Sequence, residues 1–476
     1  MDATYLFYDI ETSGLSKTFD QVLQFAAIRT DENLDEIERY EIRVTLNPDT
    51  IMHPMALITH RIDAFNQANA LGEYEAIQKI HAILNAPGTI SLGYNTLGFD
   101  DEFLRFSFFR NLLTPYTHQY ANRCGRMDLY PMVVMTWLFK PALLQWPEKQ
   151  TEQGKRVSFK LEDLNRANQL AEGQAHDAMV DVEVTLALTK KLKQDPAMWQ
   201  YLSGYFQKSI DGERAAKLTK LWGQYPEAIY VNGSCGFAQK FHFPVIGLGE
   251  HKTYRNQTLW LRLDDERLLQ TKIAHLDQTT WVVRKKWGEP GFLLPTKPAY
   301  CKHLSDERKT IIEKNKTFLL AHPDILEAIQ THYTKKTYDD VDDLDPQAAL
   351  YQMGFMSDAD ARTAYLFHRS DWARQCDCIE QFQAPELQAL AVRLLGRLDA
   401  TQLPAGYQDD FHEYLAHIWQ DGVKQQRKDH RGDFHLTAVE AQEEITRILA
   451  EKELDNQQLS LLDAYQTQLL VAEQST

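Results

Sequence analysis

Two carboxylates, one residue apart, follow an apolar run near the start of the sequence. The run Tyr5-Leu6-Phe7-Tyr8 is too short for a helix and is typical of a buried strand, and Asp9 and Glu11 come directly after it. Because side chains alternate along a strand, Asp9 and Glu11 are predicted to share one face. Close carboxylates repel each other unless a cation lies between them, and Mg²⁺ or Mn²⁺ prefers such oxygen ligands. The pair therefore predicts a metal site, although alone it also fits two solvated acids at a strand end.

A third acid, Asp100, lies in a loop between a predicted strand at residues 88–93 and a predicted helix. The helix is indicated by apolar residues at helical spacing, which are Phe103, Leu104, Phe108 and Leu112. Asp100 or its neighbour Asp101 can instead cap this helix, since acids favour helix N-termini. Both interpretations stay open, because one acid can cap while the other binds the ion.

A histidine and a fourth acid complete the group. Asp181 is predicted in the first turn of a helix that buries Val180, Val184 and Leu188, and His176 lies at or just before the helix start. Five residues do not place two side chains on one helical face, but a histidine on the preceding loop can turn over the acid. Imidazole, with an ordinary pKa of about 6.5, can act as a general base near neutral pH. The five residues together predict a metal-dependent nuclease site.

Taken jointly, this pattern resembles the histidine branch of the DEDD exonuclease superfamily. Further segments make the chain similar to bacterial exonuclease I, a family of 3′ to 5′ single-strand DNA exonucleases; they are Gln24 to Asp31, Gly93 to Asn95 before Phe99 to Glu102, Ser158 to Leu161, and Gly354 to Asp360. The resemblance runs from the first strand into the C-terminal third. His60 stands where relatives commonly have glycine, and Lys160 stands where arginine is usual, which removes the bidentate fork that arginine offers a phosphate.

Phosphodiester cleavage needs an activated water and a stabilised leaving oxygen, which two metal ions can provide. We predict that Asp9, Glu11 and Asp181 bind one ion, that Asp9 shares the second, and that Asp100 supports it directly or through water. The expected ions are Mg²⁺, with Mn²⁺ as a substitute, and the general base is His176. The resemblance implies release of 5′-mononucleotides from single-stranded DNA in repair and recombination.

The resemblance also implies substrate contacts and a protein partner. Lys160 is expected to meet a phosphate near the scissile bond, and Glu11 and His176 are expected to contact the substrate. The residues placed where the family lines its DNA groove are Phe103, Arg105, Tyr116 and Tyr120, with a core position as the alternative for Phe103. Aromatic faces there would stack on bases without reading sequence. Docking of the acidic tail of single-stranded DNA-binding protein is implied at basic pockets that include Lys140.

Composition narrows the class of protein. A formal net charge of −16 over 476 residues argues against coating nucleic acid by bulk attraction, so any DNA path must be locally basic or aromatic. Five scattered cysteines fit a reducing compartment better than a disulfide framework. The first residues lack the pattern of a signal peptide, and no apolar run approaches the roughly 20 residues of a membrane span. We expect a soluble, cytoplasmic monomer.

Changes in pattern predict three domains. Residues 1–195 alternate strands and helices and predict an α/β, ribonuclease H-like exonuclease domain with a mixed sheet, including a strand at Tyr40 to Leu46. Residues 197–348 carry short strands, and the resemblance implies an SH3-like β-barrel there. Residues 350–476 are predicted to form a helical domain, and the resemblance implies that this domain helps enclose DNA. The acidic run at residues 338–345 is interpreted as a solvated linker.

Two other functions fit parts of the pattern. A DEDD nuclease for short RNA, or a polymerase proofreading subunit, would carry the same five residues, but such proteins usually have a single domain. A DNA-binding or partner-binding module with weak catalysis is the other alternative, and the presence of all five residues weighs against it.

Overall fold

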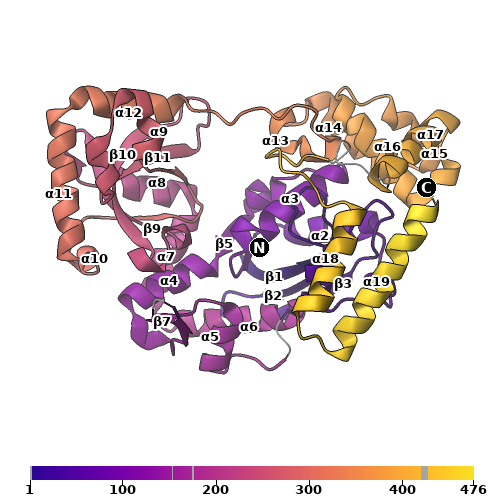
Figure 1. Ribbon diagram of the computed structural model, residues 1–476, viewed down its shortest axis with the longest axis horizontal. Helices are drawn as coiled ribbons and strands as arrows, with labels where there is room; N and C mark the ends of the chain where they lie inside the picture. The colour runs from indigo at the N-terminus through magenta and orange to yellow at the C-terminus, as the bar shows by residue number, and fades with distance from the viewer. Residues whose placement is uncertain (1–2, 153, 174–175, 420–426, 476) are drawn as a thin grey trace.

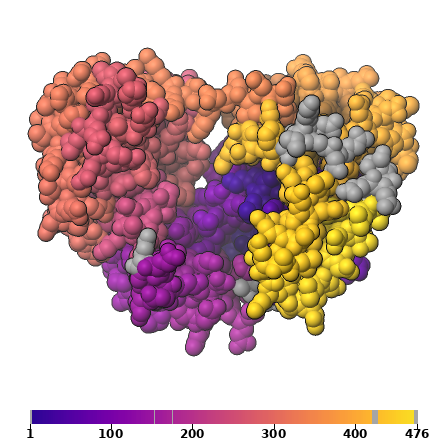
Figure 2. All heavy atoms as spheres, viewed as in Figure 1, coloured from indigo at the N-terminus to yellow at the C-terminus, as the bar shows by residue number. Residues whose placement is uncertain are grey.

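The computed structural model describes residues 3–152, 154–173, 176–419 and 427–475, with side chains described as far as residue 471. The elements form three groups around a central hollow (Figures 1 and 2). Residues up to 195 lie below the hollow in this view, residues 197–335 form its left side, and most of the C-terminal helices form its right side. The segment 336–345 contains no helix or strand and crosses from the left group to the right above the hollow.

A five-stranded mixed sheet organises the N-terminal group. Its strands are β1 (Thr4–Thr12), β2 (Val22–Thr30), β3 (Glu36–Arg43), β4 (Thr89–Gly93) and β5 (Gly125–Asp128). The order across the sheet is β3-β2-β1-β4-β5. β2 is antiparallel to β1 and β3, whereas β4 is parallel to β1 and β5. β1 is therefore central, and residues at its carboxyl end lie next to the ends of its neighbours.

Helices cover both faces of this sheet. They are α1 (Pro54–His60), α2 (Glu73–Leu84), α3 (Asp100–Arg110), α4 (Leu129–Phe139), α5 (Leu161–Asn168) and α6 (Ala178–Leu192). Alternation along β1 divides the core: Phe7 packs in one cluster with residues of α4 and α6. Leu6, Tyr8 and Ile10 pack in another with residues of α2 and α3. A hairpin of β6 (Glu148–Thr151) and β7 (Gly154–Val157) projects before α5.

The third strand lies earlier than the sequence predicted. A strand was expected at Tyr40 to Leu46, but β3 spans Glu36–Arg43. Its residues are mostly charged and exposed, so the apolar pattern used for prediction is missing, and the ladder with β2 sets its ends instead. β5 was not predicted, because it has only four residues. The short helix α1 was not predicted either.

The middle group is built on an antiparallel sheet of six strands. Its elements are α7 (Pro196–Ser203), α8 (Lys208–Ala216), β8 (Lys220–Leu221), β9 (Tyr225–Val231), β10 (His242–Glu250), β11 (Gln257–Arg262), α9 (Leu276–Thr279), β12 (Val282–Lys286), β13 (Phe292–Leu294), α10 (Pro298–Cys301), α11 (Asp306–Ala321) and α12 (Pro323–Lys335). Four of these strands, β9 to β12, overlap the strands predicted from the sequence.

The C-terminal group is helical. Its helices are α13 (Leu350–Met353), α14 (Asp358–Phe367), α15 (Trp372–Ile379), α16 (Pro385–Asp399), α17 (Ala405–Trp419), α18 (Ala438–Glu451) and α19 (Asn456–Ser475). α18 and α19 return to the N-terminal group, where Ile445 and Tyr465 pack with Leu57 of α1. Within the described residues, no helix is both long enough and apolar enough to span a membrane.

Candidate active site

The first two acids lie at the carboxyl end of the central strand. Asp9 pairs with Ala26 of β2, and Glu11 pairs with Gln24. Since they alternate with Tyr8 and Ile10, both point to the face that carries Phe7. Helix α6 covers this face, and Asp181 lies in its first turn. β1 and α6 thus bring Asp9 and Glu11 close to Asp181, although these residues are far apart in sequence.

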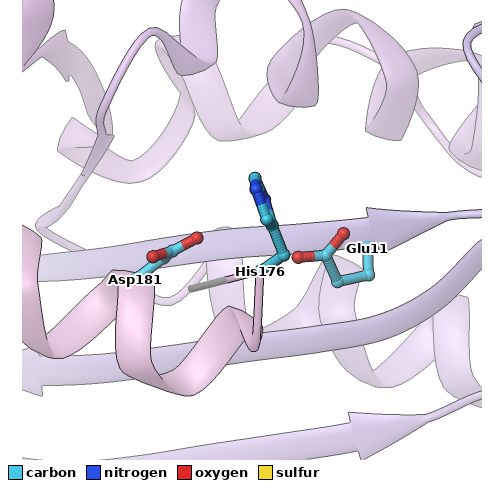
Figure 3. A group of neighbouring side chains, drawn as sticks. All are labelled: Glu11, His176 and Asp181. Carbon is cyan, nitrogen blue, oxygen red and sulfur yellow. The ribbon is translucent and has the colours of Figure 1, made fainter. Parts of the chain in front are cut away.

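His176 lies on the loop before α6, as predicted. Its backbone φ of 65° is in the left-handed region, and Asp177 caps the helix by accepting a hydrogen bond from Met179 N at 3.0 Å. Ligand atoms of Glu11, His176 and Asp181 all lie within 4.8 Å of one another. In Figure 3 the His176 side chain lies between the two carboxylates. This spacing suits a shared cation.

Asp100 approaches the same site from the other side of the sheet. It is the first residue of α3, is 6 % exposed, and accepts a hydrogen bond from the backbone of Ile10. Neither Asp100 nor Asp101 caps the helix with its side chain. Asp101 instead forms buried ion pairs with Arg126 at 2.5 Å and Arg105 at 2.7 Å. The two neighbouring acids therefore differ: Asp101 is neutralised by arginines, and Asp100 faces the other acids.

The crowded acids hold protons tightly. Burial, followed by the charges of Asp100 and Glu11, raises the pKa of Asp9 well above its usual range. Burial and the charge of Asp181 raise the pKa of Glu11 to about 8. Burial also raises the pKa of Asp100 to about 8 and that of Asp181 to about 6, although the nearby His176 lowers the latter. Such a group of carboxylates is short of positive charge, and a divalent cation supplies it.

Lys160 lies at the rim of a larger cavity. The cavity has a volume of about 940 Å³ and separates the N-terminal group from the middle group. Lys149, Arg156 and Lys160 line one side, and Asn232 to Ser234 of the middle group line the other. The Lys160 side chain is 70 % exposed and lies 3.6 Å from Glu162. Its ammonium group is reachable from solvent.

The prediction that Phe103 lines a DNA groove is wrong for this structure. Its ring has no exposed surface and packs in the cluster of Leu6, Tyr8 and Leu104. It contacts Phe99 at a ring separation of 5.7 Å. The alternative given by the helical spacing, a core position, is the correct one.

The other three predicted groove residues reach the surface to different degrees. Arg105 is mostly buried between Asp101 and Tyr351, with its guanidinium 5.3 Å from the Tyr116 ring centre. Tyr116 is partly exposed, and Tyr120 is 66 % exposed. Tyr120 therefore has the most free surface for a base. Lys140 is also exposed and forms an ion pair with Asp195 at 2.8 Å.

Two exposed apolar side chains, Phe355 and Leu15, were not among the site residues predicted from the sequence. Phe355 is 85 % exposed and lies edge-on to Tyr116, with ring centres 5.5 Å apart. Leu15, four residues after Glu11, is 79 % exposed. Phe355 lies in the run Gly354 to Asp360 that the sequence singled out, whereas Leu15 lies in none of the singled-out segments, and amino-acid type alone predicts burial for both.

Residues 6–189 match the model of the protein family RNase_T, described as exonuclease. These residues are therefore similar to that exonuclease family. The five candidate site residues all lie within the matched range, and the match ends inside α6.

Relatives that match about half to three-fifths of the chain carry a more specific name. Exodeoxyribonuclease I of Buchnera aphidicola subsp. Schizaphis graminum is 34 % identical over 242 residues, which are 49 % of each chain. Exodeoxyribonuclease I of Escherichia coli K12 is 32 % identical over 295 residues, or 60 % of each chain. The chain thus spans about half to three-fifths of the length of these curated relatives.

The fold extends the similarity over the full length. Escherichia coli exonuclease I in complex with a dT13 oligonucleotide superposes with a TM-score of 0.85, at 23 % identity, over 99 % of this chain and 100 % of that chain. A zinc-bound form of that enzyme with single-stranded DNA has a TM-score of 0.82, and an SSB/exonuclease I structure with an inhibitor has one of 0.81, both at 23 % identity and the same coverage. The predicted fold class, a ribonuclease H-like exonuclease domain followed by two further parts, is confirmed.

Proposed function

We propose that this protein is a single-strand-specific 3′ to 5′ DNA exonuclease that releases 5′-mononucleotides and acts in DNA repair and recombination. The observation that carries the proposal is the meeting of Glu11, His176 and Asp181 within 4.8 Å, with Asp100 close enough for its charge to raise the pKa of Asp9. The name and the DNA ligand of the exonuclease I relatives support DNA as the substrate.

The donor set fits hard divalent cations, and we assign Mg²⁺, with Mn²⁺ as a substitute. Asp9, Glu11 and Asp181 would hold one ion, and Asp9, supported by Asp100, would hold the second. When bound, the two ions stabilise the attacking and leaving oxygens of an in-line displacement.

The protein groups supply the remaining steps. His176 is exposed beside the acids and accepts the proton of the attacking water at an imidazole nitrogen. Glu11, next to His176, contacts the terminal nucleotide. Lys160 donates a hydrogen bond to a phosphate, with one ammonium group in place of the two-pronged guanidinium of the usual arginine.

Aromatic side chains would guide the strand. Tyr116 and Phe355 present ring surfaces from the exonuclease domain and the C-terminal group, and Tyr120 adds a third exposed ring. Stacking on such rings holds single-stranded bases without sequence preference. A chain with net charge −16 needs this kind of local contact, because its bulk charge repels DNA.

Digestion of end-labelled oligonucleotides tests the function. With Mg²⁺, wild-type protein should release mononucleotides from the 3′ end of single-stranded DNA, and duplex DNA should resist. Asp181→Ala should abolish release, whereas Asp306→Ala, which changes an exposed acid far from the site, should not. Release from the 5′ end, equal digestion of duplex, or preference for short RNA would contradict the proposal. DNA binding with no digestion would instead favour the binding-module alternative.

A protein partner follows from the resemblance and from the SSB/exonuclease I structure. We propose that the acidic tail of single-stranded DNA-binding protein docks at a basic surface that includes Lys140, whose ammonium group is reachable from solvent. Capture of the full-length partner but not of a tail-deleted one, and weaker capture by Lys140→Ala, are expected. Equal capture of both partners would contradict the docking. A monomeric state and a cytoplasmic location remain predictions.

A further inference from the structure

Three consecutive acids begin helix α3, and each makes different contacts. Asp100 faces the other acids of the candidate site, Asp101 is 1 % exposed, and Glu102 is half-buried. Phe99, at the N-cap position, gives the helix no side-chain hydrogen bond. A helix end without such a cap leaves its first N–H groups short of partners. The side chains of Asp101 and Glu102 are therefore placed to fix this first turn, and Asp100 with it.

Asp101 is held by donors from three elements. Its Oδ2 accepts hydrogen bonds from Arg126 of β5 at 2.5 Å and from Arg105 of α3 at 2.7 Å. Its Oδ1 lies 3.0 Å from Nε2 of His118, which belongs to the 3₁₀ helix at Thr117–Gln119. A carboxylate paired in this way can only accept, so His118 donates. Moving Asp101 would disturb several charge-assisted hydrogen bonds at once, and one peptide bond joins it to Asp100.

The first arginine connects Asp101 to the middle group. Arg126 is only 9 % exposed at its side chain, and its second terminal nitrogen lies 3.0 Å from Glu289. Glu289 lies in the turn between β12 and β13 and also lines the 940 Å³ cavity. The guanidinium of Arg126 thus bridges a carboxylate of the middle group and the buried carboxylate of Asp101.

The second arginine connects Asp101 to the C-terminal group. Arg105 donates a hydrogen bond to the hydroxyl of Tyr351 in α13 at 2.9 Å. That hydroxyl donates in turn to Glu102 at 2.8 Å. The ring of Tyr351 also packs edge-on against Phe106 of α3, with ring centres 5.3 Å apart. A single tyrosine of α13 is therefore bonded to both sides of the first turns of α3.

Both flanking groups thus reach the same buried carboxylate, each through one arginine. A displacement of the middle group would pull Arg126 through Glu289, and a displacement of the C-terminal group would pull Arg105 through Tyr351. Buried ion pairs are screened little by salt, so these contacts persist where surface pairs weaken. The first turn of α3 is set by contacts from all three groups.

We propose that Asp101 is a positioning residue: held by Arg126 and Arg105, it keeps Asp100 in place to support the second divalent cation, and it connects that ion to the contacts of the two flanking groups. Asp101 acts through Asp100 and not as a ligand, because its oxygens face the arginines and His118. The inference rests on the proposed function, which supplies the two-ion site.

Mn²⁺ titration of the full-length protein, with the free ion followed by electron paramagnetic resonance, tests this role without catalysis. Wild type should bind two ions. Asp101→Asn should leave the tighter ion unchanged and weaken the second about tenfold, as for other groups that orient a metal ligand. Asp49→Asn is the matched control: it breaks another buried arginine pair between two groups and should bind both ions like wild type. Thermal melting checks that each variant folds.

Variants at the outer ends of the network test the connection even if Asp101→Asn does not fold. Glu289→Gln and Tyr351→Phe remove groups that are partly exposed. Each should weaken the second Mn²⁺ about threefold and leave the first unchanged, a modest effect because each acts through an intervening arginine. Glu227→Gln, which breaks a pair with Lys316 inside the middle group, should have no effect.

The outcomes separate this inference from the proposed function. Tight binding of both ions in all three network variants, or an equal loss of the second ion in Asp49→Asn, overturns the positioning role while DNA digestion still stands. Binding of a single ion by wild type also overturns it, since Asp100 then has no second ion to support. Selective loss of the second ion in folded network variants supports the role, even if digestion shows another substrate.

Discussion

The four carboxylates of the candidate site destabilise the protein that holds them. A carboxyl whose pKa is raised on folding keeps its proton longer in the folded state than in the unfolded state. The loss of folding stability that this carboxyl causes is therefore absent below the unfolded pKa of about 4, and it grows as pH rises toward the folded pKa. For Glu11 and Asp100 that rise ends near pH 8, and for Asp181 near pH 6.

Metal-free protein should accordingly lose stability between pH 5 and pH 8, and Mg²⁺ should restore more of it at pH 8 than at pH 6. Asp181→Asn should melt at a higher temperature than wild type in EDTA at pH 8, because one repelling charge is gone. Melting curves at both pH values, with and without Mg²⁺, measure this. Asp306→Asn, on the surface, is the control. A larger Mg²⁺ effect at pH 6 would contradict the linkage.

His176 has a separate role among these residues, as the group that takes a proton. His176→Ala should slow hydrolysis by about 10²–10⁴-fold, the usual contribution of a general base, while single-stranded DNA still binds. Rates from single-turnover digestion and affinities from fluorescence anisotropy check both parts, with the exposed His412→Ala as control. Near-normal activity would exclude His176 as the base.

At the scale of elements, α3 joins three parts of the molecule. Its first residue, Asp100, belongs to the site, and Phe103 and Leu104 pack under the sheet. Phe106 and Phe109 pack with the C-terminal helices. A short helix with few exposed positions therefore couples the acid cluster to the domain that borders the hollow.

This packing predicts that Phe103 matters for stability and not for DNA contact. Phe103→Ala should lower the free energy of unfolding by about 3–5 kcal/mol, as for other buried phenylalanines. The folded variant should bind single-stranded DNA like wild type. Tyr120→Ala is the matched comparison: it should weaken DNA binding by about 1–3 kcal/mol and leave stability unchanged. Urea unfolding and anisotropy measure both, and the reverse pattern would restore Phe103 to the DNA path.

Across the whole molecule, a buried ion pair fastens the C-terminal group to the exonuclease domain. Arg397 of α16 donates two hydrogen bonds to Asp49, at 3.0 and 2.6 Å, and Tyr414 donates a third to Asp49 at 2.7 Å. Arg397 and hydrogen bonds outweigh burial and hold the pKa of Asp49 below its usual range. The stability from this carboxylate is present above pH 4 and is lost as pH falls below that.

Asp49→Ala should therefore lower the free energy of unfolding by about 3–5 kcal/mol near neutral pH, because it removes the carboxylate that pairs with the buried Arg397. The difference in free energy of unfolding between the variant and wild type should become smaller at pH 3. Asp306→Ala breaks an exposed pair with Lys309 and should cost less than about 1 kcal/mol. Urea unfolding at both pH values measures the effect; a cost for Asp49→Ala similar to that of the control would exclude the fastening role.

The sequence by itself determined the features that depend only on residues close to one another in the chain. The apolar run before Asp9, the helix that holds Asp181 and the loop position of His176 were predicted correctly, although Val180, predicted to be buried, is only half-buried. Strand alternation and helix periodicity depend on neighbours in sequence. The division at residues 195 and 348 is still a prediction, although the type of element changes near both.

Only the tertiary structure decided which surface each side chain meets. Whether Phe103 faces the sheet or DNA, and whether Asp100 or Asp101 is paired with arginines, depends on packing between distant elements. The edge strand β3 is set by its ladder with β2, so its charged residues gave no signal. Likewise, Arg43 of β3, His60 of α1 and His176 line one cavity only because these distant segments meet, and no spacing in the sequence connects them.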